Sequence, residues 1–318
     1  MHMTATKYIK VSQPFPFVLH VELARGPVNA FTTEFWTEYG AVFDRVSEGE
    51  YGDVRAVVLS SVLANIFSAG IDFQGLSFDS QSSADPARAA NALRTHILAF
   101  QYAISAPERC PVPVIAAVHG VAYGLAIDII AACDVRYAAV GATFSIKEVD
   151  VGLAADIGTL ARLPKITGNQ SLARELAYTA RTFSSAEAEK LGLVSRVIGA
   201  IEGRPGSERE TVVDAALNLA KEITSKSPVA VRGTKHLMLH SRDHGVPENL
   251  EYTATWNSAM LQTSRTWPKL YEQRNQSLAR LLRFQPCYPP QLSRSSKRDV
   301  ITDFRLMSMR EPRAPSVF

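Results

Sequence analysis

The sequence predicts an α/β fold with buried parallel strands, followed by a helical carboxyl-terminal layer. Short runs rich in Val, Ile and Phe recur between longer helical patterns, which is typical of a chain built from strand-and-helix units. Residues 113–118 form a continuous apolar run, as strands buried on both faces do. After Gln170 the strand signal fades and helical patterns take over. With 318 residues, 46% of them hydrophobic and 20% charged, the chain can bury a large core without disulfides or a structural metal.

The amino-terminal half supplies most of the predicted strands. Apolar runs at 17–23 and 54–60 predict two strands, and apolar residues at helical spacing between them predict a helix over 32–46 with Thr32 as its cap. A polar loop at 80–86 follows. The next predicted elements are a helix at 87–106 stopped by Pro107, the strand at 113–118, a short buried helix at 124–132, and short strands at 135–139 and 143–146.

The carboxyl-terminal half is predicted to be helical. Ser184 and Glu187 match a capping box, in which the side chain of each residue accepts from the backbone of the other. Residues 201–209 form a linker-like break. Helices are then predicted at 211–226, 228–240 and 247–263. Residues 271–318 mix prolines, serines and basic residues without a periodic apolar face, so we predict that this tail is disordered or loosely attached.

The charge of the chain is concentrated in that tail. The formal net charge is +3, but residues 271–318 hold 9 Lys/Arg and 4 Asp/Glu, whereas residues 1–270 hold 25 and 27. The tail therefore carries +5 and the body −2. Binding to nucleic acid by phosphate neutralisation requires clustered Lys and Arg, so the nearly neutral body argues against a nucleic-acid partner.

Cysteine usage and hydropathy bear on location. The three cysteines form no CxxC pair, and we interpret them as reduced thiols of an intracellular protein: Cys110, Cys133 and Cys287. The most hydrophobic window, 111–133, contains His119 and Asp128 and is predicted to be a strand followed by a buried helix. We predict no membrane span.

Several common sites are excluded by inspection. The sequence contains no GxxxxGK[ST] phosphate loop, no GxGxxG dinucleotide fingerprint, no GxSxG nucleophile elbow and no HExxH zinc helix. His236, His240 and His244 recur every fourth residue and could line one helical face as metal ligands. A solvated helix end running into Gly245 is the interpretation we favour, and we predict no metal site.

Three carboxylates are candidates for proton transfer. Asp128, Glu148 and Asp156 each lie among apolar neighbours in the sequence, where an ionised group is costly. Burial raises the pKa of a carboxyl group, and a second carboxyl nearby raises it further, which suits groups that exchange protons near neutral pH. Helix caps or ion-pair partners are the alternative interpretation of the same residues.

Two glycine-containing turns are candidates for binding an oxyanion. Residues 67–72 follow the strand at 54–60, and residues 119–124 follow the strand at 113–118. Two backbone N–H groups from two strand ends can flank one carbonyl oxygen and stabilise an enolate, and one such donor contributes about 3 kcal/mol to a transition state. Two ordinary turns after parallel strands are the competing interpretation.

These segments resemble the crotonase superfamily, also called the enoyl-CoA hydratase/isomerase family. The resemblance covers about residues 7–264 and is densest in FSAGID, in HGVAYGLAID and in KEVDVGLAADIGTLARLP. The last block resembles the Δ3,5-Δ2,4-dienoyl-CoA isomerase branch. The family implies a crotonase-like spiral of ββα units with a carboxyl-terminal helical layer, an acyl-CoA thioester substrate, and homotrimers or homohexamers. No metal or redox cofactor is implied, since coenzyme A enters as part of the substrate.

The resemblance also divides the chain and assigns binding residues. Residues 1–200 would be the spiral core, 201–270 the helical trimerisation region, and 271–318 the basic tail. The first oxyanion donor would be the N–H of Ile71, and the second that of Leu125, where most of the family has glycine. The Leu125 side chain is expected to narrow or reshape the acyl tunnel. The substrate-contacting segment would be Ser68, Ala69, Gly70, Ile71 and Asp72.

The acidic residues of the isomerase branch correspond to Asp128, Glu148 and Asp156. Hydratases of the family usually have glutamate at the first two positions and glycine at the third. The resemblance therefore implies isomerisation of a 3,5-dienoyl-CoA to a 2,4-dienoyl-CoA. Glu148 would take a proton from C2, and Asp156, deeper in the pocket, would deliver one at C6. Asp128 would orient the pair and tune their pKa values.

Two alternatives stay open at this point. One is an enoyl-CoA hydratase/isomerase acting on a polyunsaturated acyl-CoA in fungal secondary-metabolite (toxin side-chain) biosynthesis. The other is a non-catalytic RNA-binding member of the family, with the basic tail as the attractive element. Family relatives often end in a peroxisomal tripeptide, and residues 268–270, Pro-Lys-Leu, resemble a weak one, but 48 residues follow them. A peroxisomal location is a family expectation, and the cytoplasm is the alternative.

Overall fold

The computed structural model describes residues 6–72 and 85–262. They belong to one compact unit, Met1–Gln262. The predicted tail at 271–318 and most of the predicted loop at 80–86 lie outside the described residues. Among the helices of the described part, none is both long and apolar enough to cross a membrane.

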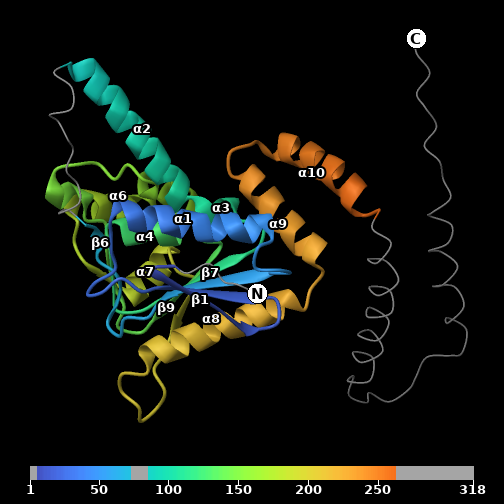
Figure 1. The fold of residues 1–318 in the computed structure, drawn as a ribbon, viewed down its shortest axis with the longest axis horizontal. Helices are drawn as coiled ribbons and strands as arrows, with labels where there is room; N and C mark the ends of the chain where they lie inside the picture. The colour runs from blue at the N-terminus through green and yellow to red at the C-terminus, as the bar shows by residue number, and fades with distance from the viewer. Residues whose placement is uncertain (1–5, 73–84, 263–318) are drawn as a thin grey trace, which may run out of the picture. The chain divides into compact units, whose positions relative to one another are not determined.

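The order of elements along the chain begins with strands and ends with helices (Figure 1). The first half comprises β1 (Ile9–Phe15), β2 (Val18–Leu23), β3 (Ala30–Phe31), α1 (Thr33–Glu48), β4 (Ala56–Ser61), β5 (Ile66–Ser68), β6 (Gly70–Ile71), α2 (Pro86–Ile104), α3 (Ala106–Arg109), β7 (Val114–Val118), β8 (Val121–Tyr123) and α4 (Leu125–Ala131). The second half comprises β9 (Val135–Ala139), β10 (Thr143–Ser145), the 3₁₀ helix η2 (Glu148–Val151), α5 (Thr159–Ile166), α6 (Gln170–Thr179), β11 (Phe183–Ser184), α7 (Ser185–Leu191), β12 (Arg196–Ile198), α8 (Glu208–Thr224), α9 (Pro228–Ser241) and α10 (Val246–Met260).

The main sheet has the strand order β1-β2-β4-β7-β9-β12 within the described residues. Strands β2, β4, β7, β9 and β12 run parallel to one another, and β1 pairs antiparallel with β2. The predicted α/β fold with buried parallel strands is therefore confirmed. Strand β1 was not predicted, because its alternation of buried and exposed residues is interrupted by Pro14.

A second, smaller set of strands lies at the ends of the main strands. Its order is β11-β10-β8-β5, and β3 pairs with β6 separately. These strands are only two or three residues long, so periodicity in the sequence reveals little of them. Of these strands, only β10 was predicted, as the strand at 143–146, and that prediction is confirmed. They are nevertheless the segments that hold the two predicted turns, since β5 and β6 flank Ala69 and β8 ends at Tyr123.

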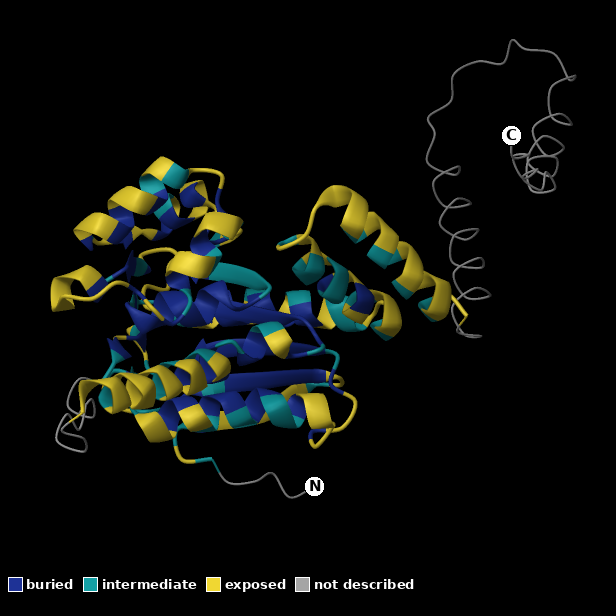
Figure 2. Ribbon diagram, turned by 90° about the horizontal axis from the view of Figure 1, so that it is seen from above, coloured by how far each residue is buried: buried dark blue, intermediate teal, exposed yellow. Residues whose placement is uncertain are grey.

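Two apolar clusters cover the faces of the main sheet. Helix α8 packs on one face, where Val58, Ile115 and Val212 belong to one buried cluster. The larger cluster lies on the other face and includes residues of α1, α3 and α4. Figure 2 shows the sheet strands almost entirely in the buried colour, whereas the helices have exposed outer faces. The central strands β4 and β7 are buried along their whole length because the sheet is covered from both sides there.

Local capping explains several helix boundaries. Thr32 Oγ accepts from the N–H of Phe35 at 3.3 Å, as predicted. The capping box of Ser184 and Glu187 is present in both directions. The prediction that Pro107 stops a helix is wrong. Helix α2 ends at Ile104, and Pro107 lies in the first turn of α3. Proline is tolerated there because an N–H group in the first turn of a helix has no acceptor within the helix.

The predicted carboxyl-terminal helical layer consists of α8, α9 and α10. The histidines of α9 are used for packing against α10, because the His236 ring stacks on Trp256 at 4.2 Å and the His240 ring on Tyr252 at 4.1 Å. His244 stacks on His240 at 3.7 Å. No cluster of three or more metal-ligating side chains occurs within residues 6–72 and 85–262. Helix α10 has no buried residue (Figure 2).

Candidate active site

Helix α4 places a carboxyl group inside the core. All seven residues of α4 are buried, and Asp128 is 1% exposed. Its Oδ1 accepts from the backbone N–H of Thr159 at 2.6 Å. Burial raises the pKa of Asp128 to about 7, and the charge of Glu148 raises it too, whereas the hydrogen bond from the Thr159 N–H and the charge of Arg162 oppose the rise. The predicted burial of this acid is confirmed, and the group titrates near neutral pH.

The two predicted turns lie against each other. Gly70 has φ +102°, and a Cβ placed there would lie 3.0 Å from Tyr123 O and 3.5 Å from Leu125 N. Only glycine fits this contact, because it tolerates the positive φ and has no side chain to separate the two backbones. The end of β6 and the start of α4 are thereby held side by side, as the two-donor arrangement requires.

The backbone geometry directs the N–H of Ile71 away from β3. Phe31 is the register partner of Ile71, and Phe31 O accepts from the N–H of Asp72 at 3.0 Å. Successive N–H groups of a strand alternate in direction, so the Ile71 N–H points to the opposite side. Leu125 is the first residue of α4, and a first-turn N–H has no acceptor within its helix. Both predicted donors have the backbone setting of an oxyanion site.

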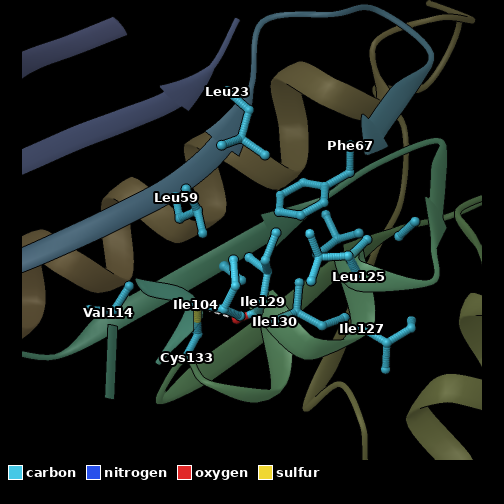
Figure 3. Packing of buried hydrophobic residues seen from close by; sticks show 14 of the residues in the cluster. Leu23, Leu59, Phe67, Ile104, Val114, Leu125, Ile127, Ile129, Ile130 and Cys133 are labelled. Atoms are coloured by element: carbon cyan, nitrogen blue, oxygen red, sulfur yellow. Dashed lines mark hydrogen bonds between the residues drawn. The ribbon is translucent and has the colours of Figure 1, made fainter. Parts of the chain in front are cut away.

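The side chain of Leu125 packs into the hydrophobic core. It is 1% exposed and belongs to the larger buried cluster, in which Figure 3 shows it beside Phe67. Replacement of the usual glycine by leucine thus leaves the backbone N–H at the start of α4 and sends the added atoms inward. The expected effect on the acyl tunnel stays a prediction.

Internal hydrogen bonds hold the predicted substrate-contacting segment. Ser68 Oγ donates to Asn29 O at 2.7 Å and accepts from the Gly70 N–H at 3.1 Å. Arg25 Nη2 lies 2.8 Å from Asp72 Oδ2. The side chains of Ser68 and Asp72 therefore shape the turn from within, while Ala69 is exposed. Sequence reasoning missed Asn29 and Arg25, which lie between the predicted strand at 17–23 and the predicted helix at 32–46 and carry no periodic signal.

Glu148 lies beside the turn at 119–124, next to the start of α4. It begins η2, is 8% exposed, and its Oε1 would be 3.6 Å from a Cβ at Gly124. Its other oxygen, Oε2, is buried without a hydrogen-bond partner among the described residues. Burial raises the pKa of Glu148, backbone hydrogen bonds lower it, and the charge of Asp156 raises it. A buried carboxylate oxygen with no donor is a strong proton acceptor.

Asp156 differs from the prediction. It acts electrostatically on Glu148, but its side chain is exposed, so the expectation that it lies deep among apolar neighbours is wrong. The cause is the extended course of the loop before α5, in which Ala155 and Ile157 turn inward at 9% and 6% exposure while the residue between them turns outward. The loop is tied to α2 by a hydrogen bond from Gln101 to Asp156 O.

The arrangement brings together two backbone N–H groups and two buried acids. Asp128 of α4 and Glu148 of η2 both have a raised pKa, and burial is the main cause in each. Groups of these types are the ones that proton transfer next to a carbonyl group requires.

This fold and site are those of a crotonase-type enoyl-CoA hydratase/isomerase scaffold, and the comparisons agree. The family model described as enoyl-CoA hydratase/isomerase matches residues 17–274, so the chain belongs to that family and is an enzyme of its enoyl-CoA isomerase type. A crystal structure of enoyl-CoA hydratase from Bacillus anthracis has a TM-score of 0.73 at 24% identity, covering 85% of this chain and 97% of that one. The predicted crotonase-like fold is confirmed.

Relatives with curated names are more similar in sequence. The human mitochondrial Delta(3,5)-Delta(2,4)-dienoyl-CoA isomerase is 48% identical over 258 residues, which are 80% of this chain and 75% of that protein. The peroxisomal enzyme of the same name from Arabidopsis thaliana is 43% identical over 248 residues, covering 77% of this chain and 85% of that protein. The resemblance stated from the motifs is thus confirmed.

Proposed function

We propose that this protein isomerises a 3,5-dienoyl-CoA to a 2,4-dienoyl-CoA. The observation that carries the proposal is the contact of Gly70 with the start of α4 beside Glu148, which sets two backbone donors next to a buried base. The named function of the 48% and 43% identical relatives supports the same reaction.

The proposed proton path runs between two acids, Glu148 and Asp156, while Asp128 orients the pair and tunes their pKa values. The Glu148 carboxylate takes the C2 proton of the substrate, which the thioester acidifies, and the electron pair spreads over the diene and the thioester oxygen. The N–H groups of Ile71 and Leu125 donate to that oxygen. Asp156 then delivers a proton at C6, which leaves double bonds at C2 and C4. The proton on Glu148 returns to Asp156 afterwards, so none is gained or lost, and no metal or redox cofactor takes part.

The test offers 3,5-dienoyl-CoA and 2-enoyl-CoA separately. We expect conjugated-diene absorbance to appear with the first and little loss of the enoyl band with the second. Asp156→Asn should lower the isomerase kcat by about 10²-fold or more, as loss of a general acid does. Asp150→Asn is the matched control, because Asp150 is an exposed acid of the adjoining η2 segment that pairs with Lys147. Full activity of Asp156→Asn, or faster hydration than isomerisation, would overturn the assignment.

We also propose that the protein is a homo-oligomer. Helix α10 has no buried residue, and its Val246 and Leu250 are 74% and 64% exposed. Met238 of α9 is 68% exposed. Apolar side chains gathered on two adjacent helices favour a partner surface. Light scattering at several protein concentrations should give a trimer or hexamer, and a monomer at all of them would contradict this.

The compartment we propose is the peroxisome, as the name of the Arabidopsis relative states for that protein. The human relative is named as mitochondrial. Fluorescence of the tagged protein against markers of both organelles decides between them.

A further inference from the structure

Arg162 connects the candidate site to the carboxyl-terminal helices. It lies in α5 with a side chain 11% exposed, and its Nε donates to Glu108 Oε2 of α3 at 2.6 Å. Its Nη2 donates to Ser105 Oγ at 2.7 Å. Glu108 Oε1 also accepts a hydrogen bond at 2.5 Å from Nη2 of Arg242, the residue that follows α9. Two nitrogens of the guanidinium are thereby fixed, and the third is directed elsewhere.

The third nitrogen lies against the backbone next to Asp128. A Cβ at Gly158 would come within 2.0 Å of Arg162 Nη1, and it would lie 3.8 Å from Asp128 Oδ1. The guanidinium and the carboxylate therefore flank the same glycine. The following residue, Thr159, is the one whose N–H binds Asp128 Oδ1. Arg162 thus supports the turn that holds Asp128 and places a positive charge close to it.

The other charged and titratable groups around this pair are few. Asp128 faces Glu148 from η2, which disfavours its ionisation, and Arg162 from α5, which favours it. Arg162 also acts on Tyr39 of α1 and on Cys133, which follows α4. Burial raises the pKa of the Tyr39 phenol and raises the pKa of the Cys133 thiol to about 12, so both are neutral at pH 7. In the part of the chain that the structure describes, Arg162 is the cation that acts on Asp128.

We propose that Arg162 is a positioning residue for the isomerisation, and this rests on the proposed function. The Arg162 charge favours ionisation of Asp128 beside Glu148. Glu108 holds Arg162 in place, so Arg162 acts on proton transfer without touching the substrate. An ionised Asp128 raises the affinity of Glu148 for the proton it takes from C2, because two like charges at short range favour protonation of one.

The experiment measures the pKa of Asp128 by carbon NMR of isotopically labelled Asp, together with the pH profile of kcat for 3,5-dienoyl-CoA. In Arg162→Gln we expect the pKa of Asp128 to rise by about one unit, since removal of a nearby opposite charge shifts a carboxyl by that order. The acid limb of the kcat profile should move up by the same amount. With a starting pKa of about 7, the ionised fraction at pH 7 falls from about one half to about one tenth, so kcat at that pH falls about fivefold.

Two further variants keep the test decisive. In Arg162→Gln, Glu108 keeps its ion pair with Arg242. Arg162→Gln with Glu108→Gln removes both charges of the Arg162–Glu108 pair and replaces the single variant if that one does not fold. Glu108 does not act directly on Asp128, so the same rise in pKa is expected. Arg242→Gln is the matched control, because it removes the other cation on Glu108 and leaves Arg162 beside Asp128.

Each outcome decides the proposal. An unchanged pKa of Asp128 in both Arg162 variants, or an equal shift in Arg242→Gln, overturns it. A fall in kcat with an unmoved pH profile assigns Arg162 a structural role and overturns it as well. The NMR titration stands apart from the reaction: wild-type protein without isomerase activity would refute the proposed function, while the titration would still report whether Arg162 controls Asp128.

Discussion

Removal of the Lys235 charge should destabilise the fold strongly. This lysine of α9 is 7% exposed, and its Nζ donates to Pro107 O at 2.8 Å, to Val112 O at 3.0 Å and to Asp134 Oδ2 at 2.7 Å. Lys235→Met leaves Asp134 as a buried carboxylate with the Val114 N–H still bound to it. Breaking a buried ion pair from one side costs about 3–5 kcal/mol. Urea unfolding at pH 7 and one fixed protein concentration measures the loss.

The same variant has a defined pH dependence. Burial raises the pKa of Asp134 above its ordinary value even with Lys235 present, and loss of the lysine raises it further. For an acid whose folded-state pKa is raised, ionisation disfavours folding, so the penalty grows with pH and shrinks as pH falls through that pKa. We expect a smaller deficit at pH 5 than at pH 7. The variant that adds Asp134→Asn should recover most of the loss, and a deficit of Lys235→Met below about 1 kcal/mol, or one that grows towards low pH, would refute the reasoning.

Three more variants test other features. Asp128→Asn should have a free energy of urea unfolding up to about 4 kcal/mol higher than wild type at pH 8, because the raised pKa of about 7 makes ionisation of Asp128 costly in the folded state. The two proteins should have equal stability near pH 4, and equal stability at pH 8 would contradict this. Gly120→Ala should destabilise by about 2–4 kcal/mol in the same assay, since its Cβ would meet Asn65 O at 2.0 Å, whereas Gly141→Ala, also at positive φ but with open space, should lose only about 1 kcal/mol. Ser184→Ala should cost about 1 kcal/mol of unfolding free energy by removing the cap of α7, and an unchanged midpoint would show that the cap contributes nothing.

Long elements with clear periodicity were predictable from the sequence. The helix after Thr32 shows its period and its N-terminal cap, and the strands at 54–60 and 113–118 are apolar runs long enough to be recognised. Strands of two or three residues, such as β3 and β6, have too few residues to show alternation. They form by pairing with each other, Ala30 with Gly70 and Phe31 with Ile71, and the two segments lie far apart in the sequence.

The candidate site was predicted in part for the same reason. The resemblance of short motifs located Asp128, Glu148 and the two turns, and their burial or contact is confirmed. Asp156 was expected to be buried because its neighbours are apolar, yet the extended backbone of its loop turns it outward. Arg162 was not singled out, because an Arg in an amphipathic helix is usually a surface residue, and its role depends on Glu108, 54 positions away.

Because every residue of α4 is buried, the part of the molecule that carries Asp128 and the Leu125 amide is also the centre of its apolar interior. Substitutions in α4 that change substrate selectivity would therefore also lower the yield of folded protein. The loop around Asp156 and the outer surface of η2 border solvent, so library design aimed at new acyl groups has the most freedom there.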